Sequence, residues 1–99
     1  MVHHIVMWNL KEELSAEEKE QAALLIKQKL EAVAEQAQGI ISLKVEINEM
    51  DSSNKDVALI SCFESEEALQ AYQISPAHKE AGAYVGSVAC KRSCFDYKE

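Results

Sequence analysis

The chain has 99 residues, of which 47% are hydrophobic and 27% are charged, and its net charge at pH 7 is −7. This composition is typical of one globular domain spanning residues 1–99, and it argues against an intrinsically disordered chain. The acidic charge argues against a nucleic-acid or anionic-membrane partner, because phosphates are bound by clustered basic residues, and the only adjacent basic pair is Lys91-Arg92.

The chain contains neither an apolar run long enough to span a membrane nor a recognisable signal peptide, so a cytoplasmic location is expected. Cys62, Cys90 and Cys94 are odd in number and lack the C-x-x-C spacing, which predicts free thiols. Cys90 and Cys94 share a strand parity and could both point inward as small hydrophobes. No metal and no cofactor is predicted.

The first two elements are a strand and a helix. Residues 2–10 are β-branched, aromatic or otherwise apolar at both parities, which predicts a strand covered on both faces. Ser15 and Glu18 then form a capping-box pattern, which predicts the start of a helix. Apolar residues recur after it at helical spacing until Gly39, which is expected to end the helix.

Two more strands and a second helix follow. Residues 41–47 alternate between apolar and polar, which predicts a strand with one face in water, nearer a sheet edge. The polar residues 50–55 predict a turn, and the almost wholly apolar residues 56–63 predict the antiparallel partner strand. Ser65 is expected to cap a helix that ends before Pro76.

The end of the chain completes a β-α-β-β-α-β order. Pro76 is expected to start only a short helical turn, Gly82 and Gly86 interrupt the next stretch, and residues 88–97 have strand-like composition. This order predicts an α+β, ferredoxin-like fold with a four-stranded antiparallel sheet and two helices on one face. The other sheet face is also apolar, which favours a homodimer whose two sheets form a barrel.

Four segments carry a family resemblance that covers essentially the whole chain. With them, the chain resembles the stress-responsive dimeric A/B-barrel family. The resemblance implies a homodimer and a cleft between sheet and helices that takes a small, partly apolar ligand. The four segments are His3-His4-Ile5-Val6, Ser61-Cys62-Phe63-Glu64-Ser65, Tyr72-Gln73-Ile74-Ser75-Pro76-Ala77-His78 and Phe95-Asp96-Tyr97.

The resemblance also implies candidate site residues. One characterised member, the plant olivetolic acid cyclase, closes a linear polyketide in an aldol-type reaction with a tyrosine and a histidine that match Tyr72 and His78. By the same match, His4 and Gly82 are candidate ligand-binding residues. An imidazole can remove a proton beside a carbonyl group near neutral pH, and a tyrosine hydroxyl can stabilise the developing enolate.

Other interpretations stay open at this point. His78 can simply donate to a backbone carbonyl while Tyr72 packs its ring in the core, and Trp8 is expected in the core or a dimer interface. His3 and His4 are adjacent on a strand, so they leave opposite faces and cannot chelate one metal between them. The function is therefore ligand binding by a stress-related dimer, a cyclase or lyase activity, or a structural or interaction role without a pocket.

Overall fold

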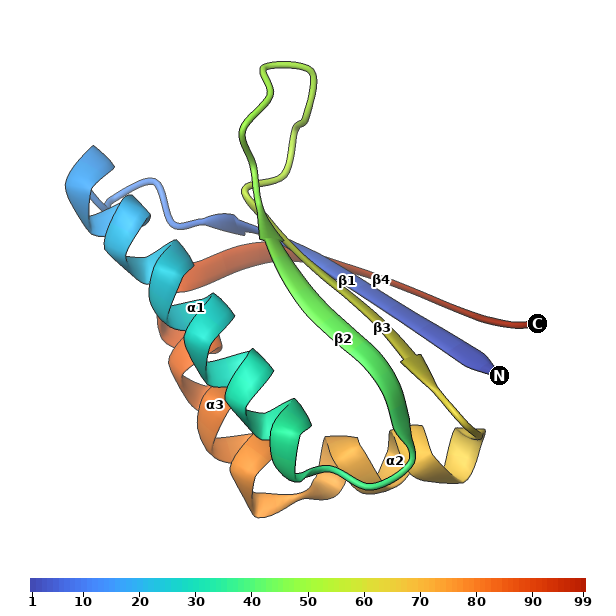
Figure 1. Ribbon diagram of the computed structural model, residues 1–99. Coiled ribbons are helices and arrows are strands. Elements are labelled where there is room, and N and C mark those ends of the chain that lie inside the picture. Colours follow the sequence, from blue (N-terminus) through green and yellow to red (C-terminus); the bar gives the residue numbers. More distant parts are fainter.

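In the computed structural model, which describes residues 1–99, the chain forms four strands and three helices (Figure 1). The elements in chain order are β1 (Val2–Leu10), α1 (Ala16–Gln36), β2 (Ile40–Ile47), β3 (Val57–Phe63), α2 (Glu66–Ile74), α3 (Pro76–Val88) and β4 (Ala89–Lys98).

The four strands form one antiparallel sheet in the order β2-β3-β1-β4. This is the predicted ferredoxin-like arrangement, and β2 lies at an edge, as its alternating pattern predicted. The two chain ends lie side by side (Figure 1), and the Glu99 amide donates to the Met1 carbonyl at 3.0 Å. The first and last segments of the sequence are therefore neighbours in the sheet.

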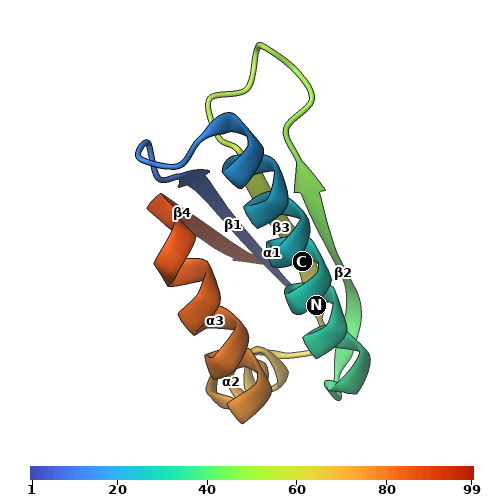
Figure 2. The ribbon, with the colours of Figure 1, turned by 90° about the vertical axis from the view of Figure 1, so that its left-hand side faces the viewer.

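The helices cover one face of the sheet (Figure 2). The predicted capping box starts α1: the Ser15 hydroxyl accepts a hydrogen bond from the Glu18 amide, and the Glu18 carboxylate accepts one from the Ser15 amide. After the helix, Gly39 adopts a left-handed φ of +77°, a conformation that suits glycine. The helix, however, already ends at Gln36 with an extended C-cap at Ala37, so Gly39 serves the turn into β2 rather than the helix stop predicted for it.

The third helix differs from the sequence prediction. The expected short turn at Pro76 is instead a 13-residue helix, so the order of elements is β-α-β-β-α-α-β. Ser75 caps this helix by accepting from the His78 amide, and Pro76 occupies the first turn, where its missing N–H is no loss. The helix continues through Gly82 and Gly86, each of which costs about 1 kcal/mol relative to alanine.

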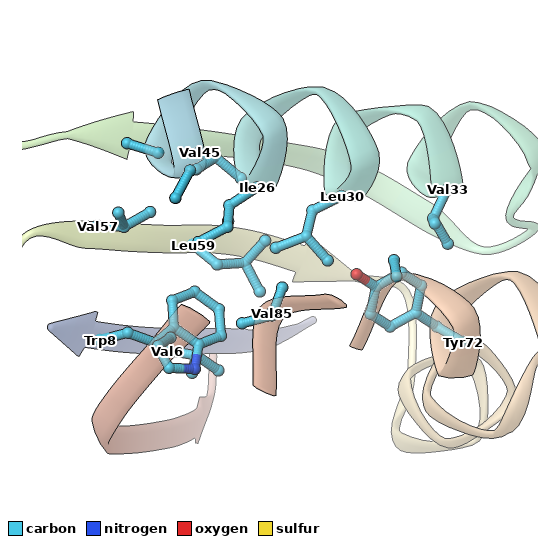
Figure 3. Close-up of a cluster of buried hydrophobic side chains, with 14 of the residues drawn as sticks. Val6, Trp8, Ile26, Leu30, Val33, Val45, Val57, Leu59, Tyr72 and Val85 are labelled. Atoms are coloured by element: carbon cyan, nitrogen blue, oxygen red, sulfur yellow. The ribbon is translucent and has the colours of Figure 1, made fainter. Parts of the chain in front are cut away.

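The hydrophobic core lies between the sheet and the helices (Figure 3). Burial alternates along β1, with every second residue from Val2 to Leu10 buried beneath the helices. The opposite, open face of the sheet carries exposed apolar side chains, including Ile60, Phe95 and Tyr97, at 38%, 64% and 39% exposure. None of the helices has the length and apolar character that crossing a bilayer requires.

Candidate functional site

A cavity of about 290 Å³ lies between the sheet and the helices, over β1 and the start of β4. All four candidate site residues line it, together with apolar core residues and a few polar ones. The lining residues are His4, Val6, Trp8, Leu30, Leu59, Tyr72, Gln73, His78, Gly82, Val85, Gly86, Ala89, Cys90, Lys91 and Arg92.

Tyr72 projects from α2 and is only 2% exposed. Its hydroxyl oxygen points toward Leu30 and Val85, which also line the cavity (Figure 3), and it has no hydrogen-bond partner in the protein. Burial raises the pKa of Tyr72 to about 12, so the phenol keeps its proton at neutral pH. A buried tyrosine hydroxyl usually has a partner. Here the phenol keeps a donor that no group of the protein uses.

His78 lies beside Tyr72, in the first turn of α3. The two rings meet edge to face with their centroids 4.6 Å apart. Burial lowers the pKa of His78, the interactions with His4 and Arg92 act in the same direction, and a hydrogen bond with the Gln73 backbone opposes them. The imidazole is therefore neutral at pH 7 and has a nitrogen lone pair available as a base.

His4 reaches the cavity from β1, on the face opposite to His3, as their adjacent positions predicted. Its side chain is buried, and its Nδ1 is 2.5 Å from Oδ1 of Asp96 on β4. Because an ionised carboxylate only accepts, Nδ1 is the donor in this contact. The sequence analysis assigned no role to Asp96, since its contact with His4 depends on the β1–β4 register.

Gly82 and Gly86 keep the α3 side of the cavity open. A Cβ atom added at either position would meet no atom within 4 Å, so it would extend into open space. Both glycines line the cavity, and two further lining residues on this side are the small Val85 and Ala89. Small side chains on α3 are therefore the reason that the core is hollow here.

Trp8 is in the core, as expected, and also lines the cavity. His3 is on the open face of the sheet, where it stacks on Tyr97 with ring centroids 4.5 Å apart and forms an ion pair with Glu99. The candidate site is therefore built from the helix-covered face alone.

Cys94 is exposed, so it is not a buried hydrophobe, although it pairs with Val6 and its Sγ lies 3.9 Å from Nδ1 of His4 on the helix-covered face. It lies on β4, which is an edge strand of the sheet, and little of the helical layer covers that strand. Partial burial and the charge of Asp96 raise the pKa of its thiol, which makes it a poor nucleophile at neutral pH. Its sulfur and the ligand atoms of His4 and Asp96 lie within 4.8 Å of one another, and these donor types are the ones that zinc accepts.

A second depression, of about 480 Å³, lies at the loop between β2 and β3. It is lined mainly by polar residues of the segment 46–58 and holds neither histidine nor tyrosine. Unlike this depression, the cavity under α3 combines an apolar wall with two histidines and a tyrosine.

The fold agrees with the comparisons with known proteins. The family model described as the stress responsive A/B barrel domain matches residues 2–99. This chain belongs to that family. No curated protein matches it in sequence.

Solved structures share the fold of this family member over nearly its whole length. A dimeric protein of unknown function with a ferredoxin-like fold from Bacteroides fragilis is 28% identical, with a TM-score of 0.92, covering 99% of this chain and 95% of that chain. A dimeric ferredoxin-like protein of unknown function from Thermobifida fusca is 15% identical, with a TM-score of 0.81, covering 99% and 90%. The hydroxynitrile lyase from Passiflora edulis is 19% identical, with a TM-score of 0.78, covering 97% and 90%.

Proposed function

We propose that this A/B-barrel protein binds a small, partly apolar carbonyl compound in the cavity between its sheet and helices. The observation that carries the proposal is the buried Tyr72 hydroxyl, which points toward the cavity-lining residues Leu30 and Val85 and has no partner in the protein. Leaving a buried hydroxyl unpaired costs about 1–3 kcal/mol, and a ligand carbonyl would remove that cost. The apolar walls formed by Val6, Leu30 and Leu59 suit the rest of such a ligand.

The protein acts as a homodimer in this proposal, with the open faces of two sheets packed against each other. The exposed Ile60, Phe95 and Tyr97 on that face support it, and so does the description of the Bacteroides fragilis and Thermobifida fusca relatives as dimeric. Sedimentation velocity is expected to give a dimer for the native chain and a monomer for Phe95→Glu. Leu24→Glu, which adds the same charge at an exposed position of α1, is the matched control and should stay dimeric.

The binding site itself can be located by NMR. Titration with cyclohexanone and 2-heptanone should shift the amide signals of Gly82, Val85 and Gly86 on α3. Ile5 and Ile60, on the open face, should not respond. Shifts confined to the open face, or no shift at all, would contradict the proposed pocket.

A second candidate function is acid–base catalysis on the bound carbonyl compound, as in an aldol-type cyclase or a lyase. The contact between the Tyr72 and His78 rings and the directions of their pKa values favour it. The neutral imidazole of His78 would take the proton from the carbon beside the carbonyl. The electron pair of that C–H bond would then form a carbon–carbon double bond, and the π electrons of the carbonyl group would move to its oxygen, which accepts a hydrogen bond from Tyr72.

Proton exchange tests this second function without a known substrate. In D₂O, the protein should accelerate the replacement of the α-protons of 2-heptanone by deuterium, measured by NMR. His78→Gln should abolish the acceleration while the melting temperature stays nearly unchanged. A native protein that binds the ketone without exchanging its protons would leave ligand binding as the function and exclude this chemistry.

A further inference from the structure

The β1–β4 pair is irregular beside the cavity. Met7 pairs with Ser93 and Asn9 pairs with Cys90, so the single residue Trp8 lies opposite the two residues Lys91 and Arg92. This is a β-bulge, in which one strand has an extra residue and side chains are redirected.

The bulge has an unusual backbone conformation. Lys91 has a φ of 52°, the only left-handed value among the non-glycine residues of the chain. Such a conformation costs a lysine of the order of 1 kcal/mol and is found preferentially at functional sites. In a regular strand, two successive side chains would leave opposite faces of the sheet. Here both Lys91 and Arg92 line the same cavity.

The two side chains bring positive charge to a strongly acidic protein. Arg92 is the only arginine of the chain, whose net charge is −7. Neither cation takes part in any of the ion pairs of the structure. With 17 acidic residues in the chain, two adjacent unpaired cations at one cavity form a local electropositive region.

The acid–base groups and the cations border one space. His4, Tyr72 and His78 line the same cavity as Lys91 and Arg92. Electrostatically, Arg92 is close enough to His78 to help lower the pKa of that imidazole. Tyr72 and the bulge therefore border the same space of about 290 Å³.

We infer that the ligand of this cavity carries a carboxylate, which is held by Arg92 and Lys91 at the bulge while its carbonyl group faces Tyr72 and His78. The inference rests on the proposed ligand-binding function and adds the substrate class. A carboxylate fits because the planar guanidinium group donates two parallel hydrogen bonds to its two oxygens. Lys91 adds a second positive charge beside this pair.

Two probes of the same shape separate binding through a carboxylate from binding through the apolar pocket alone. 4-Phenylbutyrate and 4-phenylbutyramide have nearly the same shape and differ in charge, and Trp8, the only tryptophan, reports binding by its fluorescence. The native protein should bind the acid about ten-fold more tightly than the amide, because the charged pair is stronger than a neutral hydrogen bond. Arg92→Gln should remove most of this preference, because it weakens the binding of the acid much more than that of the amide.

A charge-matched control separates local from general electrostatics. Lys79→Gln removes the same charge from an exposed position of α3 outside the cavity, and it should keep the preference for the acid. Equal affinity of the native protein for acid and amide would overturn the carboxylate inference and leave the pocket intact. Equal losses in Arg92→Gln and Lys79→Gln would also overturn it. Binding of neither compound would contradict the pocket as well.

Discussion

The two halves of the helical layer cover the same sheet in different ways. Under α1, the large side chains Ile26 and Leu30 pack against the sheet, and Val45 and Val57 beneath them are at most 2% exposed. Under α3, the corresponding surface is made by Gly82, Gly86 and other small residues, and a cavity remains.

The size of the side chains on α3 therefore decides where the core is solid and where it is hollow. The strand beneath the cavity, β1, alternates between buried and partly exposed residues more regularly than β2 and β3 do, so an irregular strand is not the cause of the cavity. The polar groups of the candidate site, His4 and Tyr72, lie only on the hollow side. One half of the layer therefore supplies stability, and the other holds the site.

The largest expected effect comes from truncating a large buried side chain of α1. Ile26→Ala should lower the free energy of unfolding by about 3 kcal/mol, because a fully buried side chain leaves a cavity behind. Leu24→Ala on the same helix, at 47% exposure, should change it by about 0.5 kcal/mol or less. Urea unfolding measures both. A similar loss for the two variants would contradict the assignment of the packed face.

Two glycine substitutions should change the stability of the protein in opposite directions. Gly39→Ala should destabilise the protein by about 2 kcal/mol, because φ is +77° and the new Cβ would lie 2.7 Å from the Cβ of Ala68. Gly82→Ala should instead stabilise it by about 1 kcal/mol, since alanine is the better helix former and the cavity has room. Thermal unfolding distinguishes them. A destabilised Gly82→Ala variant would show that the α3 side is already filled.

Removing the unpaired hydroxyl should raise stability slightly. Tyr72→Phe is expected to gain about 0.5–1 kcal/mol, because the folded state no longer buries a hydroxyl without a partner. Tyr84→Phe, on a half-buried residue of α3, is the control and should change little. Urea unfolding gives the difference. A loss of stability in Tyr72→Phe would mean that the hydroxyl already has a partner inside the protein.

The smallest effect concerns pH. His78 has a lowered pKa in the folded protein, so the unfolded chain binds a proton first as the pH falls below about 6.5. This histidine therefore reduces stability as the pH falls from about 6.5 toward its folded pKa, and it has no effect above that range. Unfolding from pH 8 to pH 5 should be less pH-dependent in His78→Gln than in the native protein. Parallel curves would indicate a solvated imidazole.

Much of the fold could be predicted because its signals are local. Ser15 and Ser65 cap their helices through residues three positions away, and the strand patterns need only their own alternation. The length of α3 could not be predicted, because packing against α1 holds two glycines in a helix against their own preference.

The site was only partly predictable. The family resemblance identified four candidate site residues, and all of them line one cavity: His4, Tyr72, His78 and Gly82. The contact of His4 with Asp96 joins residues 92 positions apart and depends on strand register. The bulge at Lys91 likewise exists only against its partner strand, although its sequence signal, the single adjacent basic pair, was visible.

The most direct test of the ligand site is the affinity of a neutral ketone for the native protein and for Tyr72→Phe. Titration with 2-heptanone, followed by the fluorescence of Trp8, should give at least about ten-fold weaker binding for the variant, whose folded structure is otherwise intact. Equal affinities would mean that the buried hydroxyl does not meet the ligand, and the proposed role of the cavity would be wrong.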